Sequence, residues 1–149
     1  MSIFELNITL PQKTIELSDI IASQITRGDI LCLRGELGTG KTFISRQIIQ
    51  SITNSSVAVT SPTFQILQIY QIEKSDSKIY HYDLYRLKHY EEIYELGIED
   101  AFNPENICII EWPEIIEQIL PQNRIDIEIF MDGKERKCII KDGSEKLKL

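Results

Sequence analysis

Gly35-Glu36-Leu37-Gly38-Thr39-Gly40-Lys41-Thr42 is the stretch of sequence that decides the fold of this chain. It matches the phosphate-binding pattern G-x-x-x-x-G-K-[ST] at every fixed position. An apolar run at 30–33 precedes it, with the composition of a buried parallel strand, and apolar residues at helical spacing follow it from 43 to 52. A strand before the loop and a helix after it are the context in which this motif binds phosphate.

The residue types in the stretch suit a nucleoside triphosphate. Its glycines let the backbone take positive φ and leave no side chain between the amides and the phosphates. Successive N–H groups then form an anion-binding nest at the N-terminus of the following helix. Lys41 would reach the β- and γ-phosphates, Thr42 would offer its hydroxyl to Mg²⁺, and the amide of Phe43 would help with the α-phosphate. The sequence therefore predicts ATP or a similar nucleotide, with Mg²⁺.

Length and composition predict one globular domain, residues 1–149, with a polar C-terminal tail from about 142. No apolar run approaches the ~20 residues that span a bilayer, and the N-terminus lacks the features of a secretory signal, so we expect a cytoplasmic protein without a membrane partner. The three cysteines, Cys32, Cys108 and Cys138, lie in or beside apolar runs without C-x-x-C spacing. They are expected to be reduced and buried, not paired in disulfides or bound to zinc.

A formal net charge of −7 bears on the partners of the chain. Proteins that grip nucleic acid by neutralising phosphates are usually basic or carry a basic stripe. The densest cationic stretch, 134–148, is interrupted by acidic residues, which is typical of a solvated strand face and tail. Any nucleic acid is therefore expected to be reached through another protein.

Periodicity and turn residues along the chain predict an alternation of strands and helices. The predicted strands are 4–10, 30–33, 57–59, 65–72, 79–84, 107–110, 124–131 and 136–140, and the predicted helices are 14–26, 43–52, 90–96 and 113–120. Two polar turns, 73–78 and the one around Asp132-Gly133, predict hairpins. The sum is a three-layer α/β domain of the P-loop NTPase type, its mixed sheet parallel at the centre and antiparallel at the edges.

Acidic residues are expected at the carboxyl ends of the strands beside the loop, because hydrolysis needs a partner for Mg²⁺ and a positioned water. Glu111 directly follows the apolar run 107–110, and Asp83 ends the run that begins at residue 79. The alternative for each is a strand-end acid that only binds loop amides. Thr63 is either a switch residue near the γ-phosphate or a plain turn residue.

Other residues with chemical potential receive a structural interpretation. His81 and His89 have no cysteine or histidine at ligand spacing, so we predict no metal role for them. Trp112 is more typical of a core or an interface than of catalysis. Arg86 is expected to pair with Asp83.

Five motifs in order resemble the TsaE family, the bacterial ATPases of tRNA threonylcarbamoyladenosine biosynthesis. They are Gly35–Thr42, Ser61–Phe64, His81–Arg86, Glu95–Asp100 and Ile110–Glu114, and the resemblance spans essentially the whole chain. It implies an ATPase that acts with a threonylcarbamoyl-transferase subunit and that subunit's non-catalytic paralogue. Together these proteins modify the adenosine beside the anticodon in tRNAs that read codons beginning with A, and the acidic charge is consistent with indirect contact with tRNA.

The resemblance also implies roles for individual residues. Lys41, Asp83 and Glu111 would be catalytic, and Mg²⁺ would be served by Thr42, Glu111 and Asp83. The nucleotide would be bound by Gly35, Gly38, Thr39, Gly40, Lys41, Thr42 and Phe43, by Thr63, and at its adenine end by Pro11, Glu114 and Arg136.

Three other functions fit parts of the sequence. A small-molecule kinase would use the same loop, but the arginine-rich lid with which such enzymes clamp the transferred group is absent. A regulatory GTPase would need the guanine-reading Asn-Lys-x-Asp motif, which is also absent. A sensor that binds nucleotide without hydrolysis would make Asp83 and Glu111 dispensable for turnover.

Overall fold

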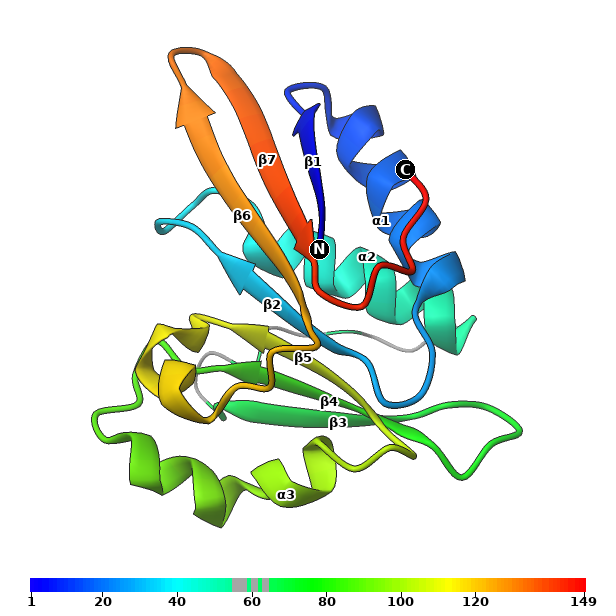
Figure 1. Ribbon diagram of the computed structural model, residues 1–149, viewed down its shortest axis with the longest axis vertical. Helices are drawn as coiled ribbons and strands as arrows, with labels where there is room; N and C mark the ends of the chain where they lie inside the picture. Colours follow the sequence, from blue (N-terminus) through cyan, green and yellow to red (C-terminus); the bar gives the residue numbers. More distant parts are fainter. Residues whose placement is uncertain (55–58, 60–61, 63–64) are drawn as a thin grey trace.

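The computed structural model describes residues 1–54, 59, 62 and 65–149, and these residues contain one seven-stranded sheet (Figure 1). Its order is β1-β7-β6-β2-β5-β4-β3. The strands are β1 (Ser2–Asn7), β2 (Ile30–Arg34), β3 (Leu67–Gln71), β4 (Lys78–Asp83), β5 (Ile107–Glu111), β6 (Ile125–Asp132) and β7 (Glu135–Asp142). The central strands β6, β2, β5 and β4 are parallel, whereas β1, β7 and β3 run antiparallel to their neighbours, which confirms the predicted mixed sheet.

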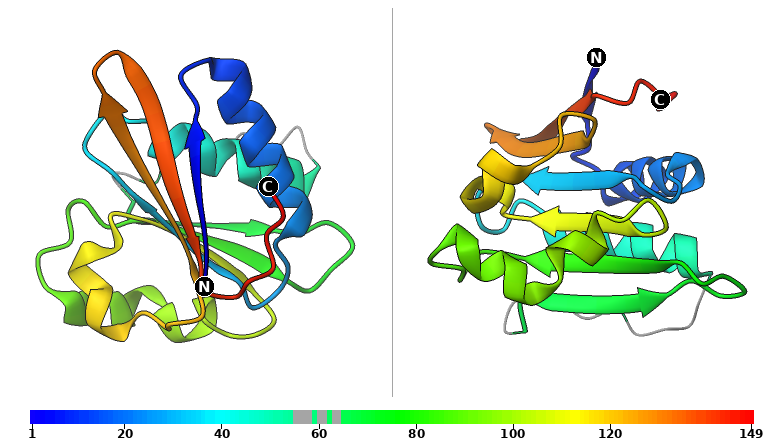
Figure 2. Two further views of the ribbon diagram at one scale, coloured as in Figure 1. Left: turned by 45° about the horizontal axis from the view of Figure 1, so that its top comes forward. Right: turned by 60° about the horizontal axis from the view of Figure 1, so that its bottom comes forward.

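Helices cover both faces of this sheet (Figures 1 and 2). The α-helices are α1 (Pro11–Gln24), α2 (Lys41–Thr53) and α3 (Ile98–Ala101), and the 3₁₀-helices are η1 (Tyr90–Leu96) and η2 (Pro113–Ile119). One core lies between the sheet and α1 with α2, and a second lies between the sheet and η1, α3 and η2. The arrangement is thus the expected three layers. Among the described residues, no helix has both the length and the apolar character to cross a membrane.

Alternation along the central strands divides their side chains between the two cores. On β2, Leu31 and Leu33 face α1 and α2, and Cys32 faces the opposite layer. Helix α2 buries Ile44 and Ile48 completely against the sheet, and each such side chain contributes about 1.5–3 kcal/mol relative to exposure. This packing holds the N-terminus of α2 at the carboxyl ends of β2 and β5.

The three cysteines lie on β2, β5 and β7 and are free and buried, as predicted. Burial raises the pKa of Cys32 to about 12 and that of Cys138 to about 11, so both thiols stay protonated and unreactive at neutral pH.

The first strand and the first helix both begin and end earlier in the chain than the periodicity predicted. Strand β1 ends at Asn7, whose side-chain Oδ1 accepts hydrogen bonds from the backbone N–H and hydroxyl of Thr9 and so turns the chain. Leu10 is exposed, and Pro11 opens α1 because its fixed φ suits the first helical turn. Most of the predicted strand 57–59 lies outside the described residues.

The C-terminal segment expected as a polar tail is packed against α1 in part. Leu147 is buried, and the backbone N–H of Lys148 donates to the side chain of Gln24. The carboxylate of Asp142 organises the turn: Oδ1 accepts hydrogen bonds from Ser144 and from the N–H of Glu145, and Oδ2 accepts one from the N–H of Leu147.

These hydrogen bonds predict that Asp142→Asn destabilises the protein by about 1–3 kcal/mol at pH 7, because the amide cannot accept on both sides. Burial would raise the pKa of Asp142, but the hydrogen bonds from Ser144 and Leu147 hold it below its ordinary value of 3.8. The group thus contributes its full stability above that value and loses it as the pH falls through the lower folded pKa. Urea unfolding between pH 2 and 7 measures this loss, and the free energies of unfolding of wild type and variant should converge at the acid end.

The control is Asp132→Asn, whose exposed ion pair with Lys137 is expected to contribute less than about 1 kcal/mol. Equal effects of the two substitutions would contradict the prediction.

Candidate functional site

Three glycines of the loop between β2 and α2 have positive φ, namely Gly35, Gly38 and Gly40, and the first and last of them shape its contacts. Gly35 has φ of +146°, and a Cβ there would lie 2.6 Å from the carbonyl oxygen of Ile129 and 2.7 Å from Oγ1 of Thr39. Gly40 has φ of +111° and precedes the first residue of α2. The first amides of α2 consequently point into the loop, where the helix dipole favours an anion.

Lys41 is held inside the loop. Its Nζ donates to the carbonyl oxygens of Gly35 at 2.6 Å and Glu36 at 2.8 Å, and it lies 4.1 Å from the centre of the Trp112 ring. Burial lowers the pKa of Lys41, and nearby carboxylates, Glu111 above all, oppose that shift. The ammonium is therefore poorly solvated, so a phosphate would be a favourable partner for it.

The two strand-end acids lie side by side, because Asp83 is paired with Glu111 in the register of β4 and β5. Both are buried. Oε1 of Glu111 accepts a hydrogen bond from the hydroxyl of Thr42 at 2.7 Å, and Oε2 lies 2.6 Å from Nε2 of His81. Oδ1 of Asp83 accepts a hydrogen bond from the N–H of Tyr85 at 3.1 Å.

A cavity of about 280 Å³ opens between these groups and the loop. Its lining includes Leu37, Gly38, Gly40, Lys41, Thr42, Phe43, Asp83, Tyr85, Glu111 and Trp112. The hydroxyl and carboxylate oxygens here are the hard donors that Mg²⁺ prefers. No group of three or more histidine, cysteine or acidic side chains among the described residues would hold a metal by itself, so a magnesium ion here would also need phosphate oxygens and water.

A second cavity of about 170 Å³ adjoins the first through Gly40 and Phe43, which line both. It brings together Pro11 and Arg136, two of the residues expected near adenine. Nε of Arg136 is buried without a hydrogen-bond partner in the part of the chain that the structure describes. A guanidinium beside apolar walls suits a flat aromatic ring, on which arginine stacks well.

One of the predicted nucleotide contacts, Glu114, is not among the described residues that line these cavities, and another lies outside the described residues. Glu114 is exposed at the start of η2 and lines neither of them. Thr63 and most of the Ser61–Phe64 motif lie outside the described residues. Their roles stay predictions.

Comparison of this chain with known proteins identifies its family. The family model "Threonylcarbamoyl adenosine biosynthesis protein TsaE" matches residues 8–139, a range that includes the loop and both strand-end acids. This chain belongs to the TsaE family. The tRNA threonylcarbamoyladenosine biosynthesis protein TsaE of Rickettsia felis is 43% identical over 136 residues, which are 90% of this chain and 78% of that protein. The TsaE protein of Bacillus subtilis is 33% identical over 129 residues, 87% of this chain and 78% of that protein.

A solved structure agrees with the α/β fold. The crystal structure of YdiB from Bacillus subtilis superposes with a TM-score of 0.74 and 25% sequence identity, over 95% of this chain and 86% of that one. The resemblance found from five motifs is thus confirmed at the level of the family and of the α/β fold.

The sequence analysis predicted no role in this TsaE-family site for two residues that contact it. His81 is fully buried and contacts Glu111, although no metal-ligand spacing pointed to it. Its position two residues before Asp83 on one strand, which puts both side chains on one face, was the available signal. Trp112 has a left-handed backbone with φ of 58° and packs on Lys41 and on the ring of Tyr85. Such backbones in non-glycine residues are concentrated at functional sites.

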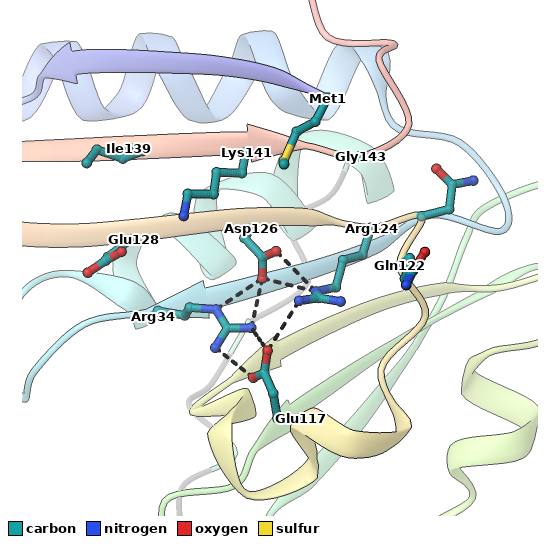
Figure 3. A pocket seen from close by; sticks show the side chains of 11 residues that line it. Met1, Arg34, Glu117, Gln122, Arg124, Asp126, Glu128, Ile139, Lys141 and Gly143 are labelled. Carbon is teal, nitrogen blue, oxygen red and sulfur yellow. Dashed lines mark hydrogen bonds and ion pairs between the residues drawn. The ribbon is translucent and has the colours of Figure 1, made fainter.

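A larger cavity, about 840 Å³, lies on the face of the sheet away from α1 and α2 (Figure 3). Its two arginines are engaged: Arg34 and Arg124 both form ion pairs with Glu117 and Asp126. Burial would lower the pKa of Arg34, but its hydrogen bond to Glu117 and its attraction to Asp126 raise it. Because these charges compensate one another, this cavity is a poor phosphate site, and the network instead fastens η2 to β2 just before the loop.

Proposed function

We propose that this TsaE-family chain is a Mg²⁺-dependent ATPase subunit of tRNA threonylcarbamoyladenosine biosynthesis in the cytoplasm. It would act on a transferase subunit and its non-catalytic paralogue and reach tRNA only through them. The observation that carries the proposal is the convergence of Lys41, Thr42, Asp83 and Glu111 on one cavity at the N-terminus of α2. This is the donor set of a phosphate loop with its acidic partners.

Lys41 has the central role in nucleotide binding. Its ammonium leaves the carbonyl oxygens of Gly35 and Glu36 and pairs with the β- and γ-phosphates, while the loop amides surround them. The adenine occupies the smaller cavity between Pro11 and Arg136. The polyphosphate then runs past Gly40, which lines both cavities.

Hydrolysis depends on the two acids. Mg²⁺, when bound, supplies positive charge to the phosphate oxygens in the transition state. Thr42 and Glu111, already 2.7 Å apart through their hydrogen bond, would hold the ion. Asp83, in register beside Glu111, serves the same ion or the attacking water. The described residues around this cavity form no second pocket for a phosphate acceptor. The site therefore gives no support to the alternative function, a small-molecule kinase.

The partner assignment rests on the family and on charge. Related proteins carry the name tRNA threonylcarbamoyladenosine biosynthesis protein TsaE. A net charge of −7 disfavours direct binding of RNA, which suits a subunit whose client is a protein. Nucleotide turnover is therefore expected to be slow in isolation and to be stimulated by the transferase pair.

The fluorescence of Trp112, the single tryptophan, tests nucleotide binding directly, because the ring lies on Lys41. Titration with ATP and Mg²⁺ is expected to change the signal and to saturate, with GTP competing poorly. Release of phosphate is then measured with and without the purified transferase pair. Fast turnover that ignores the pair, a preference for GTP, or phosphate transfer to a metabolite would each contradict the proposal.

A further inference from the structure

His81 is the one buried histidine among the described residues, and it lies directly behind the site (residues 81 and 89 are the two histidines of the chain). Its side chain is fully buried on β4, and its Nε2 is 2.6 Å from Oε2 of Glu111. The other carboxylate oxygen, Oε1, accepts the hydroxyl of Thr42. The two oxygens of Glu111 are therefore divided between one partner in the cavity and one partner inside the sheet.

The register of the sheet explains this contact. His81 is opposite Ile109 on β5, and Asp83 is opposite Glu111. His81 belongs to the pair that precedes the Asp83–Glu111 pair on the same face of the sheet. Its imidazole therefore reaches Glu111 along a diagonal, a distance that long side chains can span. An ionised carboxylate, the form of Glu111 that would bind a magnesium ion, only accepts hydrogen bonds, so in that form the proton of this contact is on Nε2.

We propose that His81 is a positioning residue for Glu111. By donating Nε2–H to Oε2, it fixes the plane of the carboxylate so that Oε1 stays beside Thr42 and open to a magnesium ion held there. Partners of this kind commonly orient the carboxylates that bind metals. The proposal rests on the proposed function, because it assigns His81 a role only if Mg²⁺ and ATP bind at this cavity.

The surroundings of His81 distinguish this role from simple core packing. Nδ1 is buried without a hydrogen-bond partner among the described residues, so only one of the two ring nitrogens is hydrogen-bonded there. An apolar side chain of similar size would avoid that unsatisfied atom. The bond that the imidazole does make is directed at a residue of the site.

The test compares His81→Leu, which removes the donor, with His81→Gln, whose amide N–H is able to reach Oε2. Trp112 fluorescence reports ATP binding as a function of Mg²⁺ concentration, without reference to turnover. His81→Leu is expected to bind ATP in the absence of Mg²⁺ within about twofold of wild type, and to need roughly 10- to 100-fold more Mg²⁺ for half of the Mg²⁺-dependent change. His81→Gln is expected to restore most of that loss.

The control is His89→Leu, which replaces the exposed histidine before η1 and is expected to leave the Mg²⁺ dependence unchanged. If His81→Leu does not fold, His81→Asn takes its place, since its amide is too short to reach Glu111. A wild-type Mg²⁺ dependence in a folded variant without the donor would overturn the positioning role, as would equal losses in the Leu and Gln variants. Failure of the wild-type protein to bind ATP with Mg²⁺ would instead refute the proposed function.

Discussion

Lys41→Ala is expected to weaken ATP binding by at least about 100-fold, or roughly 3 kcal/mol, because in the proposed complex one ammonium would contact two phosphates. No other cation lines the 280 Å³ cavity among the described residues, so the charge is not replaced. ATP hydrolysis in the presence of the transferase pair should fall to background with it. The change in folding stability should stay within about 1 kcal/mol, since the variant loses hydrogen bonds to Gly35 and Glu36 but no longer buries an ammonium.

Calorimetric titration with ATP and Mg²⁺ measures this loss without depending on Trp112, whose environment the substitution itself changes. Lys148→Ala is the matched control, because Lys148 is exposed near the C-terminus and far along the chain from the loop. Affinity close to wild type in a folded Lys41→Ala protein would show that the cavity is not the phosphate site.

Gly35→Ala is expected to lower the free energy of unfolding by about 3–4 kcal/mol and the melting temperature by roughly 10 °C. Two effects add at this residue. An alanine Cβ would lie 2.6 Å from the backbone oxygen of Ile129, which cannot move without displacing β6. The left-handed φ of +146° is strained for any residue with a Cβ.

Gly133→Ala separates the two effects. Gly133 also has positive φ, at +64°, but a Cβ there meets nothing within 4 Å. Only backbone strain applies, so a loss of about 1 kcal/mol is expected. Unfolding in urea measures both variants. If they unfold at the same concentration of urea, the close approach of Gly35 to β6 is not a determinant of stability.

The sequence alone predicted the centre of the fold and of the candidate site. The glycines and the position of Lys41 and Thr42 directly after them identify the loop, and apolar runs identify β2 and β5, because these signals are local to a few residues. Acids at strand ends also follow from a local rule, since parallel strands present their carboxyl ends at one edge of a sheet. Asp83 and Glu111 could therefore be assigned from the sequence to the edge of the sheet that carries the loop, whereas their pairing comes from the register of β4 and β5.

Local signals were less reliable at element ends. The alternation from Phe4 to Leu10 continues past the end of β1, because the turn at Asn7 depends on one side-chain hydrogen bond that periodicity does not report. Likewise, the polar composition of the last residues hides the packing of Leu147, which depends on hydrogen bonds to Asp142 and to α1.

The amino-acid sequence thus determined that a loop with Lys41 and Thr42 would lie between a strand and a helix, with two acids nearby. Tertiary structure alone decided which side chains complete that site. The contact of His81 with Glu111 depends on the register of β4 and β5, and the approach of Arg136 to Gly40 depends on how the β6–β7 hairpin passes over the loop. Such contacts join residues that are far apart in sequence, and their geometry is set by the packing of the whole sheet against α1 and α2.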